Sequence, residues 1–138
     1  YDLTQNKKYL EVAEKSLEFL SQITFKKHHY TPIGQNGWYF RNKKRSFFDQ
    51  QPEDTASMVQ TKAVAYQVTG REEHLEDAFR AFQWFLGKNH LGQMVYDEVT
   101  GGCYDGIGQY ALNLNQGAES TISYLLARLA LEEFGTTK

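Results

Sequence analysis

The chain has 138 residues, of which 41% are hydrophobic, so it can bury a core of ordinary size within one domain. Its formal net charge of −2 argues against a general nucleic-acid-binding protein, because neutralising a phosphate backbone requires a surplus of basic residues. No apolar run approaches the roughly 18 residues that a membrane-spanning helix needs. The single cysteine, Cys103, excludes a disulfide within the chain.

The first predicted helix covers residues 3–24. Its apolar residues recur at intervals of three and four: Leu10, Ala13, Leu17 and Leu20. A second helix begins near Pro52, a residue favoured at the first helical position. Glu53 and Asp54 follow, where negative charge suits the helix dipole. Gly70 is expected to end this helix.

The third predicted helix runs from residue 72 to Gly87 and includes Trp84 and Phe85, which we expect in the core. The fourth begins after Asn115, a favourable N-cap residue, and closes at residues 134–135. Its apolar line consists of Ala118, Ile122, Leu125, Leu126 and Leu129.

The connections between these helices differ in length. A few residues at 69–71 join helices two and three, which makes them antiparallel. Loops 25–51 and 88–116 are far longer, and loops of such length are usually functional. Each is expected to contain a small β-hairpin, turning at residues 42–44 and 97–101. If successive helices alternate in direction, both long loops share one end of the domain.

We therefore predict an all-α fold of about four antiparallel helices, over residues 1–138 as a single helical domain. The helices form either a small bundle or part of a larger ring of hairpins, a partial (α/α) toroid. Since the sequence begins at Tyr1 and not at Met, we expect a fragment of a larger protein. The sequence has no signal-peptide pattern. A cytoplasmic location is the working expectation.

Acids, amides and aromatic residues gather where both long loops lead into helices. Carboxylates and amides hydrogen-bond sugar hydroxyls, while aromatic rings stack on the apolar sugar face. Two suitably spaced acids also support general acid–base cleavage of a glycosidic bond. The candidate catalytic acids are Asp49, Glu53, Asp105 and Glu119. The candidate ligand-binding residues are Trp38, Tyr104, Asn115 and Gln116.

Six of the eight candidates also have a purely structural interpretation. Glu53 and Glu119 lie in first helical turns, where acids are common for dipole reasons alone. Asn115 and Asp49 could cap helices, and Asp105 could build a turn beside glycine. Trp38 could fill the core beneath its loop.

Other patterns carry weaker signals. The adjacent residues His28 and His29 cannot both face one metal ion from a regular element, and we predict neither a metal site nor a cofactor. Cys103 has no base motif nearby in sequence, which argues against a nucleophilic role. The basic turn is either a solvated hairpin tip or a contact for a phosphate or nucleotide sugar; it contains Arg41, Lys43, Lys44 and Arg45.

Three runs of residues resemble a known family. They are residues 84–89 (WFLGKN), 96–106 (YDEVTGGCYDG) and 113–121 (NLNQGAEST), and residues 48–52 (FDQQP) fit the same pattern. They are similar to the helical region that follows the glycosyltransferase domain in many bacterial group-1-type glycosyltransferase proteins. The resemblance covers about residues 38–134. That region is similar in style to six-hairpin (α/α) toroids, the fold of several glycoside hydrolases and sugar epimerases.

The resemblance implies a carbohydrate context and an upstream catalytic domain in the same protein. It assigns no catalytic role to any acid of this chain. The leading hypothesis is thus a carbohydrate-associated domain that binds or processes a glycan at the face formed by loops 25–51 and 88–116. One alternative is a non-catalytic interaction or dimerisation module, which docks against a catalytic domain or forms a homo-oligomer. The other is an acid/base site of the glycoside-hydrolase type.

Overall fold

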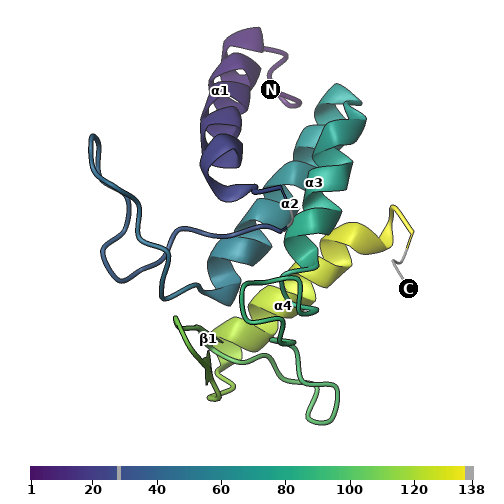
Figure 1. Cartoon of the computed structure of the whole chain (residues 1–138). Helices are drawn as coiled ribbons and strands as arrows, with labels where there is room; N and C mark the ends of the chain where they lie inside the picture. The colour runs from purple at the N-terminus through teal and green to yellow at the C-terminus, as the bar shows by residue number, and fades with distance from the viewer. Residues whose placement is uncertain (28, 136–138) are drawn as a thin grey trace.

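The computed structural model describes residues 1–27 and 29–135, which fold mainly into four α-helices (Figure 1). The helices are α1 (Lys7–Thr24), α2 (Pro52–Thr69), α3 (Glu72–Phe82) and α4 (Ala118–Glu132). Strands β1 (Gly106–Ile107) and β2 (Leu112–Asn113) form a two-stranded antiparallel sheet between α3 and α4. The predicted helical class is confirmed. A small β-hairpin was predicted within loop 88–116 around a turn at residues 97–101, whereas the two-stranded sheet of this loop lies at residues 106–113. Among the described residues, no helix is both long and apolar enough to cross a membrane.

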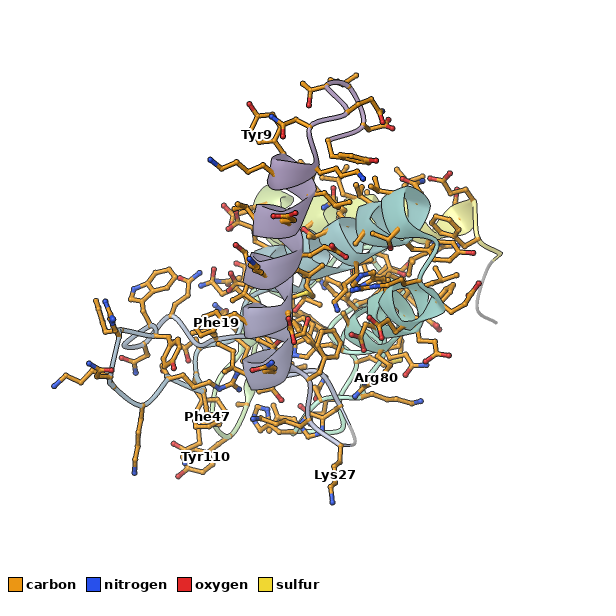
Figure 2. All side chains as sticks on the ribbon, turned by 90° about the horizontal axis from the view of Figure 1, so that it is seen from above. Tyr9, Phe19, Lys27, Phe47, Arg80 and Tyr110 are labelled. Atoms are coloured by element: carbon orange, nitrogen blue, oxygen red, sulfur yellow. The ribbon has the colours of Figure 1, made fainter. Side chains whose placement is uncertain are left out.

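Helix α2 forms the centre of the domain, because it packs against both α3 and α4. Helix α1 makes only sparse contacts with the other helices and crosses in front of them in Figure 2. Of the apolar stripe predicted for α1, only Leu17 is buried. The predicted start of α1 was also early, since the side chain of Asn6 caps the helix by accepting a hydrogen bond from the Lys8 amide.

The α2–α3 hairpin forms as predicted. Pro52 occupies the first turn of α2, and Gly70 ends the helix in the left-handed conformation at φ 69°. The Gly70 amide donates to the Tyr66 carbonyl at 2.8 Å, which closes the last turn. Helix α3 is shorter than predicted, ending at Phe82 and not at Gly87.

Trp84 and Phe85 follow α3 in a run of tight turns instead of a regular helix. The Trp84 and Phe85 amides donate to the carbonyls three residues earlier, at 3.0 Å each. Both side chains are fully buried, so their predicted place in the core is confirmed. The Phe85 ring packs against α4, where it meets Tyr124 edge to face at 5.4 Å.

Helix α4 buries a different face from the one predicted. The buried residues are Ser120, Ser123, Tyr124, Ala127 and Leu131. All five residues of the predicted apolar line are exposed instead: Ala118, Ile122, Leu125, Leu126 and Leu129. The small side chains on the buried face let α4 approach α2 closely, and Tyr124 fills the space beside them by stacking on Tyr96 at 4.2 Å.

Both predicted hairpin turns are present, although neither has strands of regular length. In the first, the Ser46 amide donates to the Trp38 carbonyl at 2.7 Å. In the second, Tyr96 and Cys103 form an antiparallel bridge around residues 97–102.

Candidate functional site

The two long loops meet at one backbone bridge. The Gln50 amide donates to the Ile107 carbonyl at 2.9 Å, and the Ile107 amide donates to the Gln50 carbonyl at the same distance. The buried Trp84 indole also donates to Gln50 Oε1 at 2.8 Å. Figure 1 shows the start of α2 beside β1, where this bridge lies. The prediction that both loops share one surface is therefore confirmed.

We call the surface around this bridge the loop seam: Phe47, Phe48, Asp49, His90 and residues 108–111. His90 Nε2 lies 3.1 Å from the Gly108 carbonyl oxygen, and because a carbonyl only accepts, this nitrogen carries a proton. The Phe48 ring packs on the His90 imidazole at 4.9 Å. These contacts join three separate segments of the chain into one surface.

The loop seam presents a carboxylate beside an exposed aromatic ring. Asp49 is exposed, and its carboxylate lies beside Gly108. A Cβ atom added to this glycine would be 3.6 Å from Asp49 Oδ1. Tyr110 is 84% exposed at the tip of the β1–β2 turn, which the Gly108 amide closes by donating to the Ala111 carbonyl. Phe47 is 49% exposed and projects on the same side of the molecule as Tyr110 in Figure 2. Tyr110 was not among the predicted site residues, since an isolated tyrosine carries no sequence signal.

Asp105 lies within hydrogen-bonding distance of the start of α4. Its Oδ1 accepts from the Gly117 amide at 2.8 Å and from the Ser120 hydroxyl at 2.6 Å. This carboxylate therefore caps α4, and Gly117, not Asn115, is the N-cap residue. Asn115 was wrongly predicted as the cap; its carbonyl instead accepts from the Asp105 amide at 2.9 Å.

Glu53 and Glu119 line one open groove between α2 and α4, with a volume of about 400 Å³. Both acids are exposed in the first turns of their helices. The remaining lining consists of Ala56, Ser57, Gln60, Ile122, Ser123 and Leu126. Two of the four predicted acids thus share a groove, whereas Asp49 belongs to the loop seam and Asp105 caps α4.

Tyr104 and Gln116 bind Asp97 and close the second hairpin turn. Gln116 Nε2 donates to Asp97 Oδ2 at 3.0 Å, and the Tyr104 hydroxyl donates to the same oxygen at 3.3 Å. The Val99 amide donates to the other carboxylate oxygen, and this bond is the main reason that the pKa of Asp97 lies below its usual range. Both predicted ligand-binding side chains therefore have partners within the protein.

Cys103 is buried beneath this turn, and its burial raises the thiol pKa to about 12. The thiol is therefore protonated at neutral pH, whereas a nucleophilic cysteine must be a thiolate. Within residues 1–27 and 29–135 no three His, Cys, Asp or Glu side chains are grouped to hold a metal ion. His28 lies outside the described residues.

Asp54 has an environment that sequence reasoning missed. It lines an apolar cavity of about 190 Å³ with Tyr30, Ile33 and Met58, among others. Its Oδ2 is buried and has no hydrogen-bond partner among the described residues. Burial, with a smaller contribution from Glu53, raises the pKa of this carboxyl to about 6. Acidic residues are common in first helical turns, so the sequence does not single out Asp54. Its carboxyl group is buried only because α1 and residues 30–33 pack over it.

Because the pKa of Asp54 is raised, we expect the free energy of unfolding to fall as the pH rises. Because the folded pKa of about 6 exceeds the ordinary value of 3.8, folding favours the protonated form, and this contribution is lost as pH rises through 6. Asp54→Asn should therefore raise the free energy of unfolding at pH 8 by about 1–2 kcal/mol, a figure reduced for partial exposure to solvent. Urea denaturation at pH 5 and pH 8 measures the effect.

The matched control for this variant is Glu119→Gln, which neutralises an exposed acid in the first turn of α4. It should change the free energy of unfolding at pH 8 far less than Asp54→Asn does. An Asp54→Asn variant whose advantage is equal at both pH values would show that burial does not perturb this carboxyl.

Comparison with known proteins gives this site no assignment. No protein-family model matches the sequence, and a search of curated proteins found no significant relative.

Proposed function

We propose that this chain is a carbohydrate-binding helical domain whose glycan site is the loop seam. The observation that carries the proposal is the Gln50–Ile107 bridge, because it brings the Asp49 carboxylate and the Tyr110 ring onto one surface from two distant loops. A carboxylate accepts hydrogen bonds from sugar hydroxyls, and an exposed ring stacks on the apolar face of a pyranose. The resemblance to helical regions of glycosyltransferase proteins supports the same ligand class.

Binding fits the loop seam better than acid–base catalysis does. Retaining and inverting glycosidases both need two carboxyl groups that flank the scissile bond and lie about 5–10 Å from each other. Asp49 is the only acid that we place at the loop seam, and Asp105 is occupied as the cap of α4. A catalytic pair, if the chain has one, is expected in the α2–α4 groove, where Glu53 and Glu119 face common space.

The proposed wider context is a larger glycosyltransferase-like protein in which this domain belongs to an (α/α) toroid. The packed antiparallel hairpin of α2 and α3, with a long loop before and after it, is the element that such a toroid would repeat. In that context the loop seam would hold an acceptor glycan near an upstream catalytic domain.

An oligosaccharide array, followed by calorimetric titration of any bound sugar, tests the proposal with the whole 138-residue chain. We expect Tyr110→Ala and Asp49→Asn each to weaken binding about tenfold, which corresponds to one lost stacking or hydrogen-bonding contact. Tyr9→Ala and Asp2→Asn are the matched controls, since Figure 2 shows Tyr9 and Tyr110 at opposite ends of the molecule. Failure of every oligosaccharide to bind, or equal losses in the controls, would refute the glycan site.

A docking module is the alternative function, and the exposed face of α4 favours it. Ile122, Leu125, Leu126 and Leu129 lie three and four residues apart and are each 45–58% exposed. Such a stripe suits contact with a second copy of the chain. A solution mass near twice 15.9 kDa, together with no glycan binding, would favour this alternative over the loop seam.

A further inference from the structure

The first long loop carries a projecting hairpin, which we call the basic hairpin and define as residues 36–48. It extends away from the helices in Figure 1, between α1 and the start of α2. Three of its aromatic side chains are largely exposed: Trp38 at 53%, Phe40 at 62% and Phe47 at 49%. The Phe47 ring lies under the Arg45 guanidinium at 4.5 Å. Isolated exposed aromatic residues are ordinary, but Trp38 and Phe40, which lead into the basic turn, together give the hairpin an apolar tip.

The charge of this region is opposite to that of the rest of the chain. Between Glu18 and Asp49 there are no acidic residues, although the chain has seventeen. The same segment holds six of the fifteen Lys and Arg residues: Lys26, Lys27, Arg41, Lys43, Lys44 and Arg45. In the part of the chain that the structure describes, no salt bridge involves Arg41, Lys43 or Lys44.

The basic hairpin is tied to the helical body. The Ser46 amide donates to the Trp38 carbonyl, and the Ser46 hydroxyl donates to the Phe48 carbonyl at 2.6 Å. Arg45 Nη1 donates to the carbonyls of Ile23 and Thr31 at 2.6 and 3.0 Å, so this guanidinium belongs to the anchor and not to the tip. These bonds order the base of the hairpin, and those of Arg45 fix it to the helical body, which reduces the conformational entropy that binding through the hairpin would cost.

We infer that the basic hairpin docks this domain on the surface of an anionic lipid bilayer. Trp38 and Phe40 would enter the interface between headgroups and acyl chains, where amphipathic aromatic rings are favoured. Arg41, Lys43 and Lys44 would contact anionic headgroups. Combining apolar insertion with a cluster of basic residues gives the two signals that stable peripheral binding needs.

The distribution of charge favours a bilayer over a nucleic acid. A single strand binds along a basic groove of several nucleotides, whereas the basic residues here are confined to one projecting loop. The body of the domain carries all seventeen acids and would repel a polyanion that ran across it. A flat bilayer can meet the tip while the acidic helices stay farther away.

Co-sedimentation of the whole chain with phosphatidylcholine vesicles, with and without phosphatidylglycerol, tests the inference. We expect binding only to the anionic vesicles and weaker binding as salt rises. The triple variant Arg41→Gln, Lys43→Gln, Lys44→Gln should lower the partition coefficient on the order of a hundredfold, at about fivefold for each charge. The matched control removes three exposed lysines from α1 (Lys7→Gln, Lys8→Gln, Lys15→Gln) and should retain most of the binding.

Tryptophan fluorescence tests insertion separately from charge. The chain has two tryptophans, and Trp84 is already fully buried, so a blue shift on adding vesicles reports Trp38. Trp38→Asn should abolish the shift; asparagine tolerates the positive φ of 55° at this position. Phe40→Ser should weaken binding with the fold unchanged, as far-ultraviolet circular dichroism would show.

Three results would overturn the inference. They are equal binding to neutral and anionic vesicles, equal losses in the hairpin and α1 triple variants, and tighter binding to a single-stranded oligonucleotide than to anionic vesicles. Phe47 and Phe48 belong to both surfaces, but the glycan array is read through Tyr110 and Asp49, which lie outside the basic hairpin and are unchanged in every vesicle variant.

Discussion

Replacing Trp84 with alanine is expected to lower the free energy of unfolding by about 3–5 kcal/mol, the largest effect of any single substitution considered. The indole is fully buried and meets the Phe85 ring edge to face at 5.2 Å. Its N–H donates to Gln50 Oε1, and the Gln50 backbone forms the bridge that holds the two loops together. Trp84 therefore stabilises the core and the loop seam at once. Urea denaturation followed by circular dichroism measures the loss.

A double-mutant cycle separates the hydrogen bond from the packing. Trp84→Phe keeps most of the apolar volume, and Gln50→Met removes the acceptor with little change in size. The two changes should couple by about 1 kcal/mol, because either one alone leaves a buried polar group without its partner. Additive effects would mean that the indole N–H contributes nothing to joining the loops. A loss below about 1 kcal/mol for Trp84→Ala would contradict its central place in the core.

Asp105→Ala is expected to cost about 2–3 kcal/mol, the second largest effect. The substitution removes the charged acceptor from the Gly117 amide and the Ser120 hydroxyl at the start of α4. Ser120 is buried, so its hydroxyl would lose a partner that solvent does not readily replace. Thermal unfolding measures the loss, and Glu119→Ala, also in the first turn of α4 but exposed, should cost far less.

Asp105→Asn distinguishes the cap from a site acid. Asparagine retains the accepting oxygen and should recover much of the stability that alanine loses. If Asp105 acts only on α4, glycan binding should survive this change. A variant of normal stability that no longer binds the sugar would place Asp105 in the site instead.

Structural features that depend on a residue and its neighbours along the chain could be predicted from the sequence. Pro52 and Gly70 bound α2 as expected, because each acts through its own backbone conformation. The meeting of the two loops could also be predicted, since it follows from a short α2–α3 connection and alternating helix directions.

Features that depend on distant residues could not be predicted. Asn115 is of a residue type that favours a cap, but the N-cap position is Gly117, and Asp105 caps α4 from twelve residues before it. Helix α4 carries apolar residues on both sides, so spacing alone could not decide that Tyr124 faces the core and Leu125 does not. Asp54 resembles any first-turn acid until the packing of α1 buries one of its oxygens.

The sequence predicted where the candidate site lies, but only some of the residues that form it. Asp49 lies at the loop seam, whereas Tyr104 and Gln116 hold the second hairpin turn through Asp97. Polar residues of these types serve turns and ligands equally well, and only their contacts separate the two roles. Tyr110 follows no motif, and its value as a stacking surface comes from its position at the tip of the β1–β2 turn.

Amide chemical shifts recorded while an oligosaccharide is titrated into the labelled chain would locate the ligand directly. If the two loops build one sugar-binding surface, the amides of Asp49, His90 and residues 108–111 should shift together with a single dissociation constant. Shifts confined to the α2–α4 groove or to α1, with those amides unmoved, would mean that joining the loops creates no glycan site.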